Sequence, residues 1–197
     1  MVLVPDHTES FHGAEGRTLR RFPRPRTGVN RVEVNTVVYL PAEEVYEFLL
    51  EFRNYASYSE HLRDVREAGD GEVGTEYELE FAWWKLTYTA RSEVTELDPP
   101  ERIEWRLTED VDAAGRWLVE PAGEGPAEPK TEVTFVAEYA PGSADGGIVD
   151  LPRFVSLEWV VEKVKPRIER EAERVVRRVV ADLEGDAREV DLRIETG

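Results

Sequence analysis

The chain has 197 residues, and 25 lysines and arginines stand against 42 aspartates and glutamates, so the formal net charge is −17. It contains no cysteine, which excludes a disulfide framework, a thiolate nucleophile and cysteine-ligated metal sites. No apolar run approaches the roughly 20 residues that cross a bilayer, and the first residues do not form a secretory signal. We therefore expect a cytoplasmic protein with no stable membrane insertion.

Among the basic residues only Lys85, Lys130, Lys163 and Lys165 are lysines, and the others are arginines. An acid-rich, lysine-poor composition is typical of a halophilic cytoplasm, where salt shortens the Debye length to about 3 Å at 1 M. An ordinary acidic protein is the alternative. At low salt the charge argues against nucleic acid as a partner.

The first 28 residues show little periodicity and contain five arginines. We expect residues 1–28 to form an extended or partly disordered arm, which either binds an anionic partner or lies on the chain's own acidic surface. A single folded domain is expected over 29–184, followed by a C-terminal tail or extra strand over 185–197.

Period-2 alternation over 32–38 predicts a first strand, and Pro41 then opens a helix that carries apolar residues at helical spacing. A second short helix is expected over 54–62. Turn residues then separate six further segments, which gives about seven antiparallel strands. The expected segments lie near 63–68, 74–84, 85–97, 102–109, 114–120 and 131–140.

One long helix is predicted over 148–183, with a kink or split near 162–165 because Pro166 removes a backbone hydrogen bond. After Gly185 a short alternation predicts a last strand. That strand could pair with the N-terminal arm or with a second subunit, so a homodimer is one expected arrangement.

Alternation within the middle strands places aromatic side chains on the inward face and charged side chains outside. Because buried tyrosine and tryptophan need hydrogen-bond partners, we expect an apolar pocket with a few polar tips. The alternative is that Trp105 and Trp117 simply fill a large core. Polar groups that could orient a ligand are Ser92, Glu96, Tyr88 and Tyr139. The expected pocket lining is Tyr77, Phe81, Trp83, Tyr88, Ser92, Trp105, Trp117, Phe135, Tyr139, Val161 and Val164, with Tyr55, Tyr58 and His61 at the rim.

Several segments resemble the START-like, helix-grip superfamily, also called SRPBCC, in its polyketide cyclase/dehydrase and coenzyme Q-binding branch. They are Val34-Asn35-Thr36 leading into Pro41–Leu49, Phe52-Arg53-Asn54-Tyr55, Glu96–Ile103, and Gly115-Arg116-Trp117 with Thr131–Phe135. The resemblance covers about residues 30–184. It implies an α+β fold, in which a curved antiparallel sheet wraps around a long C-terminal helix and two short helices follow the first strand. It also implies a hydrophobic cavity between sheet and helix. The arginine-rich arm, Pro166 and the extra strand depart from the family pattern.

No catalytic constellation is evident, because His61 is the only histidine of the expected domain and lies on a short polar helix. His7 and His12 match no metal-site spacing, and no phosphate or dinucleotide fingerprint is present, so we expect no metal and no cofactor. The leading interpretation is a protein that binds, and transports or presents, a small hydrophobic ligand such as a lipid, quinone or isoprenoid. The alternatives are a polyketide cyclase/dehydrase-like enzyme, with Tyr or His61 moving protons, and a ribosome- or protein-associating adaptor of the same fold.

Overall fold

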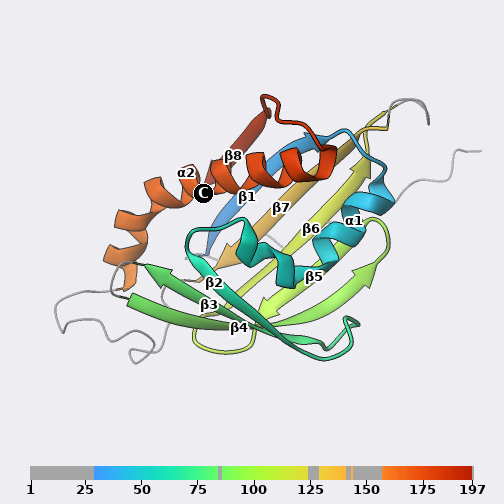
Figure 1. Cartoon of the computed structure of the whole chain (residues 1–197). Coiled ribbons are helices and arrows are strands. Elements are labelled where there is room, and N and C mark those ends of the chain that lie inside the picture. Colours follow the sequence, from blue (N-terminus) through green and yellow to red (C-terminus); the bar gives the residue numbers. More distant parts are fainter. Residues whose placement is uncertain (1–28, 84–85, 124–128, 141–142, 144–156, 197) are drawn as a thin grey trace, which may run out of the picture.

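A computed structural model describes residues 29–83, 86–123, 129–140, 143 and 157–196, and only the backbone at residues 83, 86, 157–169 and 196. Eleven elements form in this part of the chain (Figure 1). In order they are β1 (Asn30–Val38), α1 (Ala42–Leu50), the 3-10 helix η1 (Phe52–Ser57), β2 (Leu62–Ala68), β3 (Glu76–Trp83), β4 (Leu86–Asp98), β5 (Arg102–Leu107), β6 (Ala113–Pro121), β7 (Thr131–Tyr139), α2 (Leu157–Glu184) and β8 (Leu192–Thr196).

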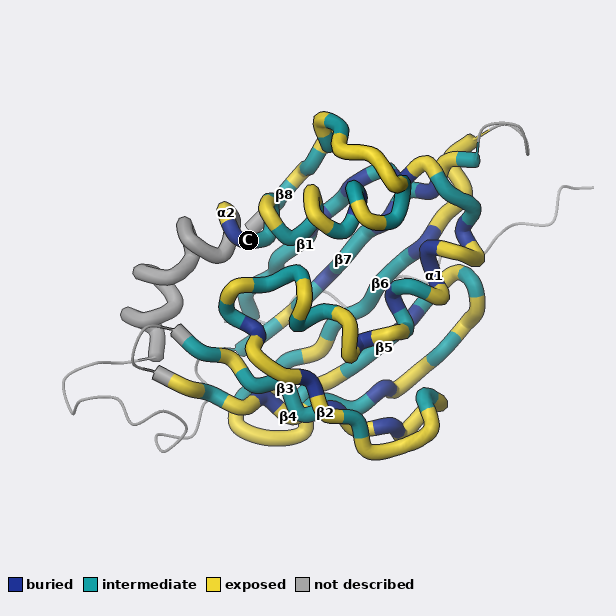
Figure 2. The backbone as a smooth tube through the Cα atoms, viewed as in Figure 1, coloured by how far each residue is buried: buried dark blue, intermediate teal, exposed yellow. Residues whose placement is uncertain are grey.

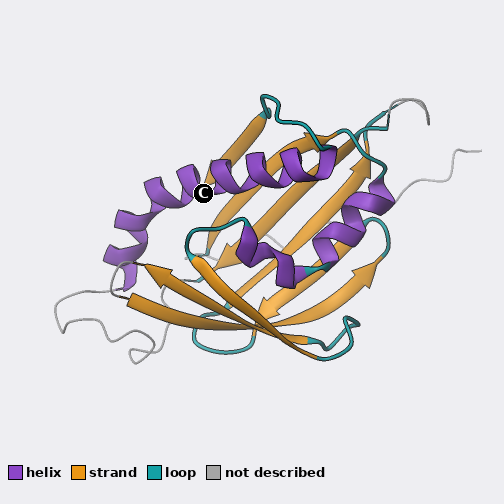
Figure 3. Ribbon diagram, viewed as in Figure 1, coloured by secondary structure: helices purple, strands orange, loops and turns teal. Residues whose placement is uncertain are grey.

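The strands form one antiparallel sheet in the order β2-β3-β4-β5-β6-β7-β1-β8. The sheet is curved, and α1, η1 and α2 all lie on its concave side (Figure 3). Short connections explain the antiparallel pairing, since neighbouring strands follow one another from β2 to β7. The expected helix-grip fold is therefore confirmed, with eight strands among the described residues instead of about seven.

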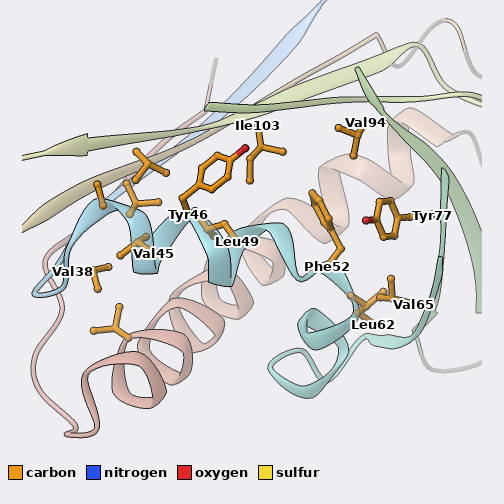
Figure 4. Close-up of a cluster of buried hydrophobic side chains, with 14 residues drawn as sticks. Val38, Val45, Tyr46, Leu49, Phe52, Leu62, Val65, Tyr77, Val94 and Ile103 are labelled. Carbon is orange, nitrogen blue, oxygen red and sulfur yellow. The ribbon is translucent and has the colours of Figure 1, made fainter. Parts of the chain in front are cut away.

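The core is densest where α1 packs on the sheet. Helix α1 begins after Pro41, whose carbonyl accepts the amide of Val45 at 3.2 Å, and Glu43 and Glu44 in its first turn suit the positive end of the helix dipole. Its inward side chains meet fully buried strand residues such as Ile103 (Figure 4). This packing holds one end of the sheet closed.

Strand β8 pairs antiparallel with β1, from Val32 opposite Thr196 to Thr36 opposite Leu192. The sequence had left its partner open between the N-terminal arm and a second subunit, and the structure instead places it on the edge of β1. The arm itself, residues 1–28, lies outside the described residues. Beyond α2, Arg188 fixes the connection to β8, because its guanidinium bonds the Glu184 carboxylate at 2.6 Å and the Val37 carbonyl at 2.7 Å.

Helix α2 is continuous from Leu157 to Glu184, so of the two outcomes predicted for Pro166, a kink or a split near 162–165, the split does not occur. Its ribbon bends along its length (Figure 1). The predicted helical residues before 157 lie outside the described part of the chain. Among the helices that the structure describes, none combines the length and the hydropathy of a membrane span.

The predicted inward position of Glu96 is wrong. The pairing of β4 with β5 shifts register between Val94 and Glu96, so one extra residue lies in β4. Such a bulge exchanges the two faces of a strand, and Leu97 consequently takes the inward position opposite Ile103. Glu96 is exposed and forms an ion pair with Arg102 on the outer face.

Candidate functional site

Burial of the concave face changes along the strands. Near α1 the inward side chains are excluded from solvent, with Ile103 and Val119 at 0% exposure. At the end of these strands farther from α1, several inward residues are only half-buried; half-buried residues are teal in Figure 2. These half-buried residues are Tyr88, Ser92, Trp105, Leu107, Trp117, Phe135 and Tyr139. The concave face is therefore fully buried at one end and only partly buried at the other.

The floor of this face is a connected row of aromatic rings. The ring centroid of Trp117 lies 4.6 Å from that of Phe135, and Trp105 stacks on Phe135 at 6.2 Å with an interplanar angle of 16°. On the other side Tyr55 meets Trp117 edge-on at 6.2 Å, at 81°. Because β5, β6, β7 and η1 each supply a ring, the strand register holds the rings at fixed spacing.

The row continues toward β3 through Phe52, whose centroid lies 5.2 Å from that of Tyr55 and 4.8 Å from that of Tyr77. Tyr77 is buried at 3% exposure, and burial raises the pKa of its phenol. Phe52 was not among the predicted site residues, although it follows the apolar spacing of the helix predicted after Pro41. Its role as a bridge depends on the η1 turn, which folds Phe52 and Tyr55 onto the sheet.

The far end of β3 and β4 is more open. Phe81 pairs with Tyr88 across the two strands and remains 36% exposed. Tyr88 is half-buried, and burial followed by the nearby Asp110 charge raises the pKa of its phenol. Ser92 is half-buried opposite Leu107. Three predicted lining residues cannot be placed in this way, because the side chains of Trp83, Val161 and Val164 lie outside the described residues.

The three predicted rim residues differ in position. Tyr55 packs beside the aromatic floor, and its hydroxyl donates a hydrogen bond to the Leu49 carbonyl at 2.6 Å. Tyr58 donates to Asp182 of α2 at 2.5 Å, and burial together with this bond raises the pKa of Tyr58 to about 12. His61 is half-buried at the start of β2, where its carbonyl accepts the amide of Ala82 at 2.8 Å.

Glu171 of α2 holds the segment just before β2. The residue is 8% exposed, and its carboxylate accepts the amide of Glu60 at 2.9 Å and pairs with Arg174 at 3.2 Å. The bond links α2 to the segment just before β2, which borders the concave face. Sequence alone could not assign this role, because the helix carries many glutamates at equivalent spacing.

Charged side chains of the strands gather on the outer face, as the alternation predicted. Arg91 bonds Glu78 and Glu109, and Arg106 bonds Glu93 at 2.8 Å. These exposed pairs contribute little stability individually. The inward side of the described strands β3 to β7 carries apolar and hydroxyl-bearing side chains, whereas on β2 Glu67 lies opposite Tyr77 and pairs with Arg53 of η1 at 2.7 Å. Among the described residues, no group of histidine and carboxylate side chains has the arrangement of a metal site.

Two hollows lie away from the concave face. A groove of about 550 Å³ runs beside α1 and the end of α2, and a smaller hollow of about 220 Å³ lies on the outer face of β5 and β6. The groove is shallow, and its lining includes Glu44, Glu47 and Glu51 as well as Phe48. An acidic, open groove is less suited to an apolar molecule than the aromatic floor of the sheet.

Residues 30–180 match a protein-family model described as polyketide cyclase / dehydrase and lipid transport. The chain belongs to this family. The match ends within α2, so β8 lies outside the matched residues. The START-like resemblance carried by the sequence motifs is confirmed.

Solved structures show the same fold at low sequence identity. The Zhui aromatase/cyclase from Streptomyces sp. R1128 is 19% identical, with 79% of this chain and 94% of that chain covered and a TM-score of 0.57. A norcoclaurine synthase from Thalictrum is 14% identical over 82% and 99% of the two chains, with a TM-score of 0.54. Major latex-like protein 151 from Panax ginseng is 12% identical over 79% and 97%, with a TM-score of 0.53. No curated protein sequence matches the chain significantly.

Proposed function

We propose that this protein binds a small hydrophobic molecule between the far end of the sheet and α2. One observation carries the proposal: aromatic side chains on the concave face stay half-buried while their neighbours toward α1 are fully buried. Several aromatic side chains that remain partly exposed side by side form an apolar patch, and contiguous apolar patches favour a binding surface. The family description, which includes lipid transport, supports the same assignment.

The ring arrangement favours a ligand with extended apolar surface. Trp105, Phe135 and Trp117 present adjoining faces and edges, and contact with such rings is favourable in proportion to the apolar area removed from water. Ser92, Tyr88 and Tyr139 supply hydroxyl groups near the same surface. A lipid, quinone or isoprenoid has the required apolar body with a small polar end.

A cyclase or dehydrase activity is the second candidate, favoured by the family description and by the fold shared with the Zhui aromatase/cyclase. The reaction would need an inward group that exchanges a proton. Among the described inward side chains, Tyr88 is such a group. Turnover of a reactive polyketide that is lost in Tyr88→Phe would support this candidate, and unchanged turnover would contradict the role of Tyr88.

Binding is tested with N-phenyl-1-naphthylamine, a neutral probe whose fluorescence rises in apolar surroundings. The test variant is Ala137→Leu, because Ala137 is half-buried on the inward face of β7, next to Gly115 beneath the Trp105 ring. The matched control is Ala114→Leu, since Ala114 is exposed on the outer face of β6. We expect saturable binding that Ala137→Leu weakens at least about tenfold and Ala114→Leu leaves unchanged. Equal binding by both variants would contradict the proposed site.

A further inference from the structure

The sheet has two edge strands, and they differ in how they are protected. Strand β8 lies at one end of the strand order and β2 at the other, so each has one side without a neighbouring strand among the described residues. Unpaired amide and carbonyl groups along an edge can pair with another chain, and proteins often prevent this with a bulge or an inward-pointing charge. The presence of these features therefore indicates which edge is closed to a partner.

Strand β2 carries both protective features. Its pairing with β3 shifts register between Leu62 and Asp64, which places a bulge at the start of the strand. On its inward side Glu67 lies opposite Tyr77 and forms an ion pair with Arg53 of η1 at 2.7 Å. A second chain added beside β2 would meet the bulge and an inward carboxylate, so this edge is unsuited to further pairing.

Strand β8 has neither the bulge nor the inward charge. Its five residues pair with β1 in continuous register. The inward positions of β8 include Leu192 and Ile194, which are half-buried. Its outer positions are Arg193 and Glu195, which are exposed. The free side of β8 is therefore suited to pair with another strand.

The two charges of β8 have no partners within the described part of the chain. Arg193 lies opposite Asn35 of β1, and Glu195 lies opposite Glu33. Like charges directly opposite each other on neighbouring strands are unfavourable. Neither Arg193 nor Glu195 forms an ion pair with another described residue. The edge therefore presents one positive and one negative group, and both remain available to a partner.

We propose that β8 pairs antiparallel with β8 of a second copy of this chain, about a two-fold axis at Ile194. In this register the two Ile194 side chains lie opposite each other on the inward side. On the outer side Arg193 of each copy lies opposite Glu195 of the other, and the symmetry forms this pair twice. Opposite charges across paired strands are favourable, so the charge order of β8 is complementary to its own reverse.

The size and charge of the interface set its strength. A pair of five-residue strands buries less surface than the roughly 1,200 Å² of a standard interface, so the dimer is of the weak class. Each copy also carries a net charge of −17, and this repulsion opposes association until salt screens it. We expect a dissociation constant of about 10 μM at about 0.5 M KCl, where the Debye length is a few ångströms.

The test measures the dimer dissociation constant by sedimentation equilibrium at this salt concentration. Arg193→Glu brings like charges together at both pairs and should weaken the dimer at least about tenfold, and Glu195→Arg should do the same. An equimolar mixture of the two variants should associate as a heterodimer, because each pair then joins opposite charges. The matched control is Arg63→Glu, since Arg63 is exposed on β2 and the net charge changes equally. The control should leave the dissociation constant unchanged.

Three outcomes would overturn the proposal. Wild-type protein that stays monomeric well above the expected dissociation constant would leave the edge of β8 to residues 1–28 or to another protein. A dimer that Arg193→Glu weakens no more than Arg63→Glu does would place the interface elsewhere. If a single variant does not fold, the double variant Arg193→Glu/Glu195→Arg restores opposite charges at both pairs and should dimerise as the wild type does. A folded double variant that stays monomeric would contradict the proposed pairing.

Discussion

Gly115 is where the aromatic floor is most sensitive to an added methyl group. A Cβ at this position would lie 2.6 Å from the Val136 carbonyl oxygen and 2.7 Å from Cε2 of Trp105. Because carbon atoms make contact at about 3.5 Å or more, and Cζ2 of Trp105 would lie closer still, the Trp105 ring would need to retreat by about 1 Å. The Val136 carbonyl cannot move so far, since it belongs to β7, which is paired on both sides.

Gly115→Ala should therefore destabilise the fold by about 2–3 kcal/mol, toward the upper part of the range for overpacked sites. For a chain of this size, that corresponds to a fall of about 4–12 °C in the thermal midpoint. The assay is thermal unfolding followed by circular dichroism, with the intrinsic fluorescence of tryptophan as a local reporter of Trp105.

A double-mutant cycle identifies the clash. In the Trp105→Ala background the ring has gone and only the carbonyl contact remains, so Gly115→Ala should cost about 1 kcal/mol less than in the wild type. An unchanged midpoint in Gly115→Ala would refute the close packing of Trp105 on β6. Equal costs in the two backgrounds would refute the assignment of the clash to the ring.

Three further predictions concern individual side chains, and a fourth concerns the net charge. Tyr46→Phe should leave the free energy of unfolding unchanged or raise it by about 1 kcal/mol, because the buried Tyr46 hydroxyl has no hydrogen-bond partner within the described structure. Tyr55→Phe should lower it by about 1–2 kcal/mol, because the bond to the Leu49 carbonyl of α1 is lost; both variants are measured by urea unfolding. The pKa of Tyr58 is raised to about 12, so its contribution to stability is complete below about pH 10 and is lost between about pH 10 and 12. Tyr58→Phe should therefore reduce the fall in the free energy of unfolding at alkaline pH, and Asp182→Asn should reduce it by a smaller amount. Arg188→Ala should speed amide exchange in β8, because the guanidinium bonds a β1 carbonyl, and exchange no faster than in the wild type would contradict that link. Because acidic groups outnumber basic ones, the thermal midpoint should rise between about 0.1 M and about 3 M KCl, and a falling midpoint would contradict a halophile-like surface.

Alternating side chains allowed most of the sheet to be predicted from the sequence. The aromatic and charged positions of β3 to β7 take opposite faces, and the proline and glycine clusters fall between strands. Alternation predicted the wrong face for Glu96 because the bulge adds one residue to β4, and no glycine near Thr95 indicates the bulge in the sequence. A bulge of this kind is set by pairing with β5, which is a property of two strands and not of one.

The turn between β5 and β6 could be anticipated only in part. Its sequence has no glycine, so one of its residues must supply any positive φ, and aspartate is among the few that tolerate it. In the structure this residue is Asp110, with φ of 72°.

Alternation predicted the inward side of Trp105, Trp117 and Phe135, whereas Tyr55 was expected at the rim and the difference in burial along the strands was not predicted. Ile103 and Trp105 have the same parity on β5, yet the first is fully buried and the second half-buried. The difference arises because α1 covers only one end of the sheet (Figure 1). How much of a sheet a helix covers depends on the three-dimensional arrangement, which the alternation of side chains along a strand does not predict.

The most direct test of the account is the identity of what the protein carries. The protein is purified from its own host in molar salt, extracted with organic solvent and analysed by mass spectrometry, with Ala137→Leu prepared in parallel. The account predicts a stoichiometric apolar compound that is depleted in the variant. A folded wild-type protein whose extract contains no such compound, or one equally abundant in Ala137→Leu, would contradict it.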